Sequence, residues 1–478
     1  MKRVIACWQW FAGLFKPLRV SNPVTVHSTT KRELWLSYEI ESGPTPDQRA
    51  ENYTRHCRLE GLPPELRRYL LSTLDIIPMM AIIQASPIFY QQYLSDRKFL
   101  LCSSLETTLG SAVVDAFFTH FFVTQASLGS VSTDIFSANC RSFQAENIMK
   151  QKLTEFVKSY SEITFQRCLP HTLTAKLTED EAISMARFYV RYVRPLIDYF
   201  GWWMLENLAE EAGEDISINR PGITLSRTEM LRLTRAIYRL QILGQVNAAN
   251  RLVSGHPEDY VEVVLDTFEP WEAEELFSFY QFAHAHYYMI FNDIRWDLHP
   301  DNPSFADQTR PPTPSGAFDM DNPMDFDNLL EGTTLRGLRL LHTVLFRLKD
   351  HSHLVSIMQE HITRSYIPLN AYEGYFGWTD QELRRRRNPS DRDRMQKAKV
   401  QFLFRGDAEP DGPPLAWIRI WKNTYSNLYG RYIPDEMRRW GFVFWDAATL
   451  ESTRGMEVLE RQWRKCWKGE DPRESLSY

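Results

Sequence analysis

The sequence predicts an all-α protein, an irregular multi-helix bundle built as one large helical layer or as two packed layers. Apolar residues recur at helical spacing from Leu62 onward. Several helix starts carry Ser or Thr with Glu three residues later. Alternating patterns typical of strands are scarce, apart from a short candidate run from Trp417 to Trp421. With 43% apolar and 13% aromatic residues, the 478-residue chain can build a packed core, which excludes a mainly disordered protein.

Residues 1–60 are expected to form a poorly ordered lead-in, because they are polar and are interrupted by Pro17, Pro23, Pro44 and Pro46. The first residues join a basic tip to a short apolar run, Val4 to Phe15. This run is too short to span a bilayer, and no small-x-small cleavage site follows it. An amphipathic anchor or a poorly ordered leader is therefore favoured over secretion.

Two capping boxes open predicted helices in residues 109–296, which we expect to form a helical domain. Thr178 with Glu181 begins an aromatic-rich helix that runs towards Trp203, and Pro195 should kink it. Ser226 with Glu229 begins a second helix, for which Gly244 is the predicted C-terminal stop.

Residues 331–470 are expected to form a C-terminal helical region. Its leucines, from Leu335 to Leu348, keep the spacing of one helix face. Thr379 with Glu382 opens a further helix that must end before Pro389.

Between these regions, residues 297–330 predict a long, mobile acidic loop that separates two helical layers. Prolines remove amide donors and like charges repel one another, so regular structure is disfavoured. Whether this loop links two domains or leaves and rejoins one domain stays open. Its prolines are Pro300, Pro303, Pro311, Pro312, Pro314 and Pro323.

Composition also limits the function classes. The formal charge of −6 and pI near 6.1 give no basic domain, so nucleic acid is not expected as a partner. The six cysteines have no paired spacing, which is typical of a reducing compartment, cytoplasmic or nuclear. No stretch is long and apolar enough to predict a transmembrane segment. Dinucleotide, P-loop, nucleophile-elbow and zinc-protease motifs are missing, so we predict no catalytic residue, metal ligand or cofactor.

Residues 61–108, and Leu62 to Tyr93 above all, form the most informative segment. Pro63 and Pro64 suit a helix start, because their fixed φ is already helical and the amides they lack are not needed there. Leucines at helical spacing then form one apolar face, and Pro78 separates it from a second helical stretch. Two interpretations stay open. These helices are either the N-terminal corner of a larger core or a docking module.

The order Leu62-Pro63-Pro64-Glu65-Leu66, then Leu70, Leu74, Met79 and Ile83, resembles an F-box. More loosely, the whole chain resembles helical proteins of filamentous fungi that carry such a segment and a Trp-rich C-terminal stretch. The F-box tail that usually contains Trp is replaced here by Ile83-Gln84-Ala85 with Phe89 and Tyr90.

The resemblance implies an F-box-like adaptor of a ubiquitin ligase that recruits an unknown protein target. The contacts with a Skp1-type adaptor would be made by Leu62, Pro63, Glu65, Leu66, Leu70 and Ile83.

Other residues allow different functions. The aromatic cluster Trp417 to Trp445 suits a buried core better than a binding face. His284 and His286 lie two residues apart and cannot ligate one metal from a regular helix, so structural roles are favoured. Arg384, Arg385, Arg386 and Arg387 form a solvated helix end or a nuclear import signal.

Two alternatives to an adaptor stay open. One is a helical enzyme, for example in fungal secondary metabolism, with a pocket lined by His284, Asp293 and Arg295. The other is a structural scaffold.

Overall fold

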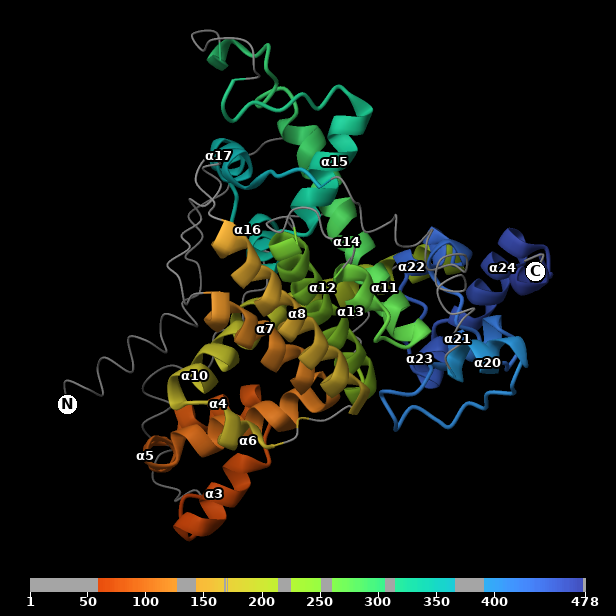
Figure 1. The fold of residues 1–478 in the computed structure, drawn as a ribbon. Helices are drawn as coiled ribbons and strands as arrows, with labels where there is room; N and C mark the ends of the chain where they lie inside the picture. Colours follow the sequence, from red (N-terminus) through yellow and green to blue (C-terminus); the bar gives the residue numbers. More distant parts are fainter. Residues whose placement is uncertain are drawn as a thin grey trace. The chain divides into compact units, whose positions relative to one another are not determined.

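The computed structural model describes residues 59–126, 143–166, 169, 171–213, 225–250, 260–305, 314–365 and 391–475 (Figure 1). Over these ranges the predicted all-α fold is confirmed: no strand is present, only an isolated antiparallel bridge between Gln401 and Thr424. The chain divides into two compact units, Met1–Leu100 and Leu101–Tyr478. The division falls inside helix α6 (Arg97–Leu109), and the expected helical domain, residues 109–296, and the expected C-terminal helical region, residues 331–470, both belong to the second unit.

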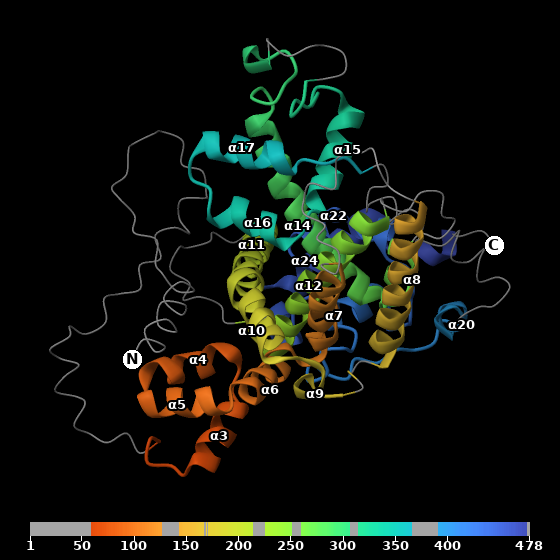
Figure 2. The same cartoon turned by 60° about the vertical axis from the view of Figure 1, so that its left-hand side comes forward.

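The first unit is described from residue 59 and contains three short helices, which Figure 2 shows packed together, and the first turn of α6. Pro64 and Pro87 each occupy a helix start, where a missing amide costs nothing. The side chain of Ser86 also accepts a hydrogen bond from the Phe89 amide at 3.4 Å. The helices are α3 (Pro64–Ser72), α4 (Ile76–Ala85) and α5 (Pro87–Ser95).

The second unit is organised around two long helices, α12 (Arg227–Asn250) and α14 (Pro270–Ile294), which pack against each other. Helix α12 also packs against α7, α8, α11 and α13. The helices around this pair are α7 (Val113–Ala126), α8 (Phe143–Gln166), α9 (Leu173–Lys176), α10 (Glu179–Phe188), α11 (Arg194–Ala212), α13 (Tyr260–Leu265), α15 (Pro323–Thr334), α16 (Leu338–Phe346), α17 (His351–His361), α20 (Asp391–Lys397), α21 (Leu415–Ile420), α22 (Asp435–Arg439), α23 (Ala447–Ser452) and α24 (Gly455–Trp467). The described part of the unit also contains 3₁₀ turns at Gly110–Ala112, Pro303–Phe305, Gly430–Tyr432 and Pro472–Ser475.

Both capping boxes expected in the described residues are confirmed. Thr178 accepts from the Glu181 amide at 3.3 Å, and Glu181 accepts in return from the Thr178 amide at 2.7 Å. Ser226 and Glu229 make the same reciprocal pair, at 3.1 and 2.8 Å. The Thr379 box and the Arg384 to Arg387 cluster lie outside the described residues.

The expected disturbance at Pro195 takes the form of a π-helical turn. This turn, Tyr189–Val193, joins α10 to α11 and ends two residues before the proline. Proline has no amide hydrogen to donate to the carbonyl four residues earlier, and a wider turn accommodates that loss.

The prediction that Gly244 ends its helix is wrong. Helix α12 continues to Asn250, so Gly244 lies inside it. A Cβ atom at this position would lie 2.5 Å from the carbonyl oxygen of Leu335. The glycine therefore permits a close approach of another chain segment. The candidate strand from Trp417 to Trp421 is also wrong, because Leu415–Ile420 forms α21.

The predicted acidic loop, residues 297–330, is too long at its C-terminal end. Helix α15 begins at Pro323, where the Asn322 side chain accepts from the Met324 amide at 3.0 Å. The Phe318 amide donates to the Leu298 carbonyl at 2.8 Å, and both Leu298 and Phe305 are buried. A proline directly after an Asn cap starts a helix instead of prolonging a loop. Residues 306–313 of the loop are outside the described ranges.

The leucine stripe from Leu335 to Leu348 is not one helix. Gly337, with φ of 98°, separates the end of α15 from α16, and Leu335 is the residue at the end of α15. A φ in this region favours glycine, so the break depends on that residue.

Candidate functional site

One face of α3 exposes apolar side chains. Leu66 and Tyr69 are 51% and 69% exposed, and Pro63 and Pro64 are exposed beside them. Leu62 and Leu70 are half-buried at the edge of this face, and Glu65 is exposed. Only Leu71 of this helix is fully buried. The sequence-predicted contact residues other than Ile83 thus gather on one accessible helix and the turn before it.

Ile83 does not belong to that face. It is 3% exposed and lies on α4, whose buried residues also include Ile76 and Met79. A side chain at this depth cannot touch a partner while the unit stays folded, so we reassign Ile83 to the core of the first unit. Tyr69, the most exposed apolar residue of α3, was missed by the sequence reasoning, although its position three residues after Leu66 is a helical-spacing signal.

Polar contacts on the other side of α3 hold this orientation. The Arg67 guanidinium donates to the Glu60 carbonyl at 3.0 Å, and Ser86 donates to the Glu60 carboxylate at 2.5 Å. Arg68 lies 3.7 Å from Asp96 and stacks 4.3 Å above the Phe99 ring. The arginines therefore tie α3 to its own unit, and Leu66 and Tyr69 are left on the outside.

The second unit contains a buried ionic network between α12 and α14. Arg235 makes two hydrogen bonds to Glu275, at 2.5 and 2.8 Å, and lies 3.2 Å from Glu272. Arg239 reaches Glu272 at 3.1 Å and Asp115 at 3.4 Å. Burial raises the pKa of Asp115 and of Glu275, and the neighbouring arginines oppose this shift.

This network is structural. The cavity beside Asp115, Arg235 and Arg239 measures about 10 Å³, which is about the space of a single water molecule. No substrate fits there. Buried charges of this kind need partners, and the network supplies one for each.

Two further ion pairs connect the C-terminal region to α12 and α14. Arg438 of α22 donates to Glu274 at 2.9 Å, and the Gly430 amide donates to the same carboxylate at 2.5 Å. At the start of α12, Arg232 donates to Asp446 at 3.0 Å. Burial raises the pKa of Asp446 to about 6, although a hydrogen bond from Ser226 and the charge of Arg232 oppose the shift.

The Trp-rich cluster lies in the core, as the favoured interpretation predicted. Trp417, Trp421, Trp440 and Trp445 are each at most 1% exposed. The indole N–H groups of Trp440 and Trp445 donate to Gln462 and to the Trp440 carbonyl, both at 2.8 Å. These four rings therefore offer no binding face.

The histidines have separate structural contacts. His284 lies 3.7 Å from Glu331. His286 contacts the Phe282 carbonyl at 2.8 Å and the Tyr199 hydroxyl at 3.2 Å. Within the described ranges, no group of three or more His, Cys, Asp or Glu side chains is arranged to hold a metal ion.

The pocket expected for a helical enzyme is not formed by the residues we named. Asp293 lies 3.6 Å from His351, and Arg295 lies 2.6 Å from Asp321. His284 turns to Glu331, so the three side chains have three different partners. That particular arrangement is therefore excluded.

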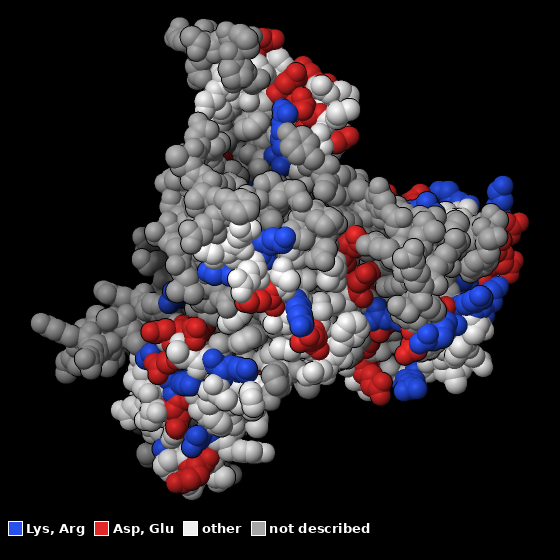
Figure 3. All heavy atoms as spheres, in the orientation of Figure 1, with Lys and Arg blue, Asp and Glu red and all other residues white. Residues whose placement is uncertain are grey.

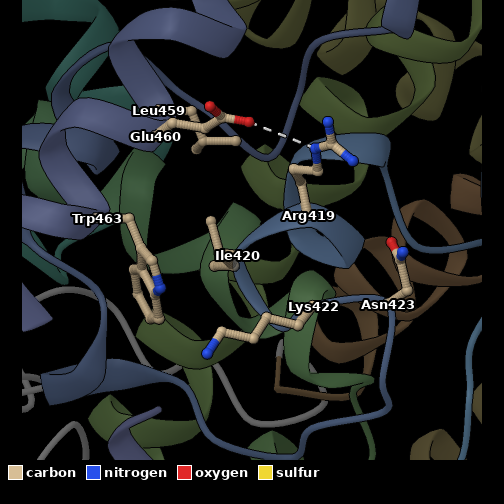
Figure 4. A pocket seen from close by; sticks show the side chains of 7 residues that line it. All are labelled: Arg419, Ile420, Lys422, Asn423, Leu459, Glu460 and Trp463. Carbon is tan, nitrogen blue, oxygen red and sulfur yellow. Dashed lines mark ion pairs between the residues drawn. The ribbon is translucent and has the colours of Figure 1, made fainter. Parts of the chain in front are cut away.

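Surface hollows occur elsewhere in the second unit. One of about 220 Å³ lies between α21 and α24, where Arg419 pairs with Glu460 at 3.5 Å above Ile420 and Trp463 (Figure 4). Lys422 and Asn423 beside it have left-handed backbones, with φ of 55° and 58°. The Asn423 amide donates to the Ile418 carbonyl at 2.8 Å, which closes the end of α21. Helix capping therefore explains the left-handed backbone conformations of Lys422 and Asn423.

A larger hollow, about 550 Å³, is formed by residues 402–413 against Trp271. Its ionisable lining residues are Arg405, Glu409 and Asp411, and neither Ser, Cys nor His is among the described residues that line it. Asp411 pairs with Arg235 at 2.8 Å. The lining therefore lacks a nucleophile with an adjacent base, which acyl transfer or hydrolysis of that kind requires.

None of the described helices is long and apolar enough to cross a bilayer. No family model matches the chain, and comparison with curated proteins and with solved structures returns no match.

Proposed function

We propose that this protein is a non-enzymatic F-box-like adaptor, whose first unit docks on a Skp1-type partner through the exposed face of α3. The observation that carries the proposal is the orientation of that helix, which exposes Leu66 and Tyr69 while its arginines contact its own unit. The remaining contact residues are Leu62, Pro63, Glu65 and Leu70.

The chemistry of this face suits a protein partner. Aromatic side chains bury much area at low entropic cost and are enriched among residues that dominate binding energy. Tyr69 also has a hydroxyl that can form a hydrogen bond with a partner. Pro63 and Pro64 restrict the backbone at the start of the helix. Burial of two such side chains contributes on the order of 3–5 kcal/mol before the costs of association.

Co-purification of the full chain with a Skp1-type protein tests the proposal. The double variant Leu66→Ala/Tyr69→Ala should lose most of the co-purified partner, because it removes the exposed apolar contacts. The variant Leu62→Ala/Pro63→Ala should weaken recovery as well. The matched control is Ile88→Ala/Leu94→Ala, which removes two apolar side chains of α5 that are 38% and 39% exposed.

Circular dichroism must show that all variants keep the helical content of the parent. Equal recovery of the partner with the α3 and the α5 variants would contradict the proposal, as would the absence of any Skp1-type protein from the parent sample. The scaffold interpretation would then remain.

An adaptor of this kind works in the cytoplasm or the nucleus. The cluster Arg384 to Arg387 is our proposed import signal, on the basis of its four consecutive basic residues. Fluorescence microscopy of the full chain with these four residues changed to Ala tests it. An unchanged distribution between nucleus and cytoplasm would contradict nuclear import by this cluster.

A further inference from the structure

A second set of exposed apolar side chains lies on the second unit, on the C-terminal half of α14, the turn that follows it and the start of α15. It consists of Tyr288, Met289, Trp296 and Met324, which are 50%, 58%, 60% and 72% exposed. We call these four residues the α14/α15 surface. Helices α14 and α15 pack against each other, and both views of the fold show them side by side (Figures 1 and 2).

Contacts between rings and charges connect Tyr288 to Trp296. The Tyr288 ring meets the edge of Phe326 at 5.6 Å, and Arg295 lies 6.0 Å from the same Phe326 ring. Arg295 pairs with Asp321, which also lies 3.4 Å from His299. The Trp296 ring stacks on His299 at 5.7 Å, so the chain of contacts runs from Tyr288 to Trp296.

These contacts also fix the exposed rings before any partner arrives. Because Tyr288 rests on Phe326 and Trp296 rests on His299, their rotamers are already restricted. A partner would therefore lose less conformational entropy on ordering them. Trp, Tyr and Met are the side chains that the centres of protein interfaces favour.

Seven aspartates lie on α14, on α15 and on the described parts of the segment between them, and we call them the aspartate rim. Figure 3 shows acidic side chains gathered around α15, with few basic ones among them. Two arginines pair with these aspartates, Arg295 with Asp321 and Arg364 with Asp325. Two histidines also contact them: His351 lies near Asp293 and Asp297, and His299 near Asp301 and Asp321. The aspartates are Asp293, Asp297, Asp301, Asp319, Asp321, Asp325 and Asp327.

We propose that the α14/α15 surface binds a basic amphipathic segment of a partner protein, with apolar side chains on the aromatic and methionine centre and Lys or Arg on the aspartate rim. Charge complementarity selects this occupant. Nucleic acids and anionic membranes carry the same sign as the rim, so like-charge repulsion disfavours both. The surface belongs to a different unit from α3, and the inference goes beyond adaptor docking without depending on it.

Fluorescence anisotropy with the full chain tests the inference. The probe is a labelled peptide with Leu every three or four residues and Lys at the positions between, and the comparison peptides replace Lys by Glu or Leu by Ser. The Lys/Leu peptide should bind, and each comparison peptide should bind at least about tenfold more weakly, because one lacks the charge and the other the apolar face. Raising the salt to about 0.5 M should weaken binding of the Lys/Leu peptide, since its contacts with the rim are exposed.

Two variants locate the site. Tyr288→Ala/Trp296→Ala should weaken binding of the Lys/Leu peptide by about tenfold or more. Phe165→Ala/Leu403→Ala is the matched control in the same unit, because these side chains are 62% and 65% exposed, and it should bind like the parent. Asp321→Asn/Asp327→Asn should weaken binding at low salt, and the difference from the parent should shrink at high salt.

Failure of the Lys/Leu peptide to bind would overturn the inference, as would binding that the Tyr288→Ala/Trp296→Ala variant leaves unchanged. Equal binding of the Glu/Leu peptide would remove the charge argument. Sedimentation with vesicles rich in phosphatidylserine distinguishes a membrane from a protein partner, and cosedimentation that requires Tyr288 and Trp296 would contradict a protein segment as the occupant.

Discussion

Helices α3 and α14 differ in which side chains they bury. Eighteen of the 25 residues of α14 are buried, and three of them are glutamates, Glu272, Glu274 and Glu275. In α3 a single residue, Leu71, is buried, while a leucine and a tyrosine face outward. The comparison shows that polarity alone does not decide burial. A charged side chain is buried where a partner meets it, and an apolar one stays outside where no neighbouring helix covers it.

The largest expected effect lies in the buried network of α14. Arg235→Met removes the arginine that pairs with Glu275 and leaves Glu272 with Arg239 alone, and an uncompensated buried charge is costly. We expect the free energy of unfolding to fall by about 3–5 kcal/mol, measured by urea denaturation with tryptophan fluorescence. The control is Arg68→Met in the first unit, where the pair with Asp96 is exposed and the loss should stay below about 1 kcal/mol. Similar losses for both variants would remove the difference that we draw between the two helices.

A second prediction tests the close approach at Gly244 on α12. Ala has the higher helix propensity, but its Cβ atom would lie 2.5 Å from the Leu335 carbonyl oxygen. We expect Gly244→Ala to lower the free energy of unfolding by about 1–3 kcal/mol, because backbone atoms must move apart. Gly213→Ala is the comparison, since a Cβ atom at that position would meet nothing within 4 Å and only the left-handed φ of 67° opposes the change, at about 1 kcal/mol. A stabilised Gly244→Ala variant would show that this contact is not tight.

A third prediction concerns pH and Asp446, where burial raises the pKa from 3.8 to about 6. Between pH 4 and 6 the folded protein keeps this proton while the unfolded chain has lost it. The free energy of unfolding contributed by this group therefore falls as pH rises through that range. Urea denaturation at several pH values should show a shallower fall for Asp446→Asn than for the parent. Identical pH profiles for the two proteins would refute the assignment.

The smallest expected effect is on the exposed face of α3. Leu66→Ala should change the melting temperature little, because the side chain is 51% exposed and its removal opens no cavity, so the loss stays within about 0.5 kcal/mol. Leu71→Ala on the same helix removes a fully buried side chain and should cost about 2–5 kcal/mol. Hydrogen exchange of the α3 amides reports this local unit directly. Equal losses at the two positions would mean that Leu66 is covered in solution.

Local signals in the sequence predicted much of the secondary structure. The boxes at Thr178 and Ser226 and the interruption before Pro195 depend on groups within a few residues of one another, so a linear pattern is sufficient to identify them. The same reasoning failed at Gly244, because the neighbour that requires a glycine there is Leu335, which is far away in the chain. The sequence-based prediction also placed the end of the acidic loop beyond Pro323, although a proline after Asn322 starts a helix there.

The sequence by itself determined the all-α fold and the helix starts at Pro64, Thr178 and Ser226, because these depend on periodicity and on neighbouring residues. The tertiary structure alone decided that Ile83 packs inside its unit and that Tyr69 stays outside. It also connected Tyr288 to Trp296 through contacts with Phe326 and His299, and it joined Arg235 of α12 to Glu275 of α14. It buried four tryptophans of the C-terminal region, Trp417, Trp421, Trp440 and Trp445. These outcomes depend on which helices pack together, and side-chain burial is a property of that packing and not of any local pattern.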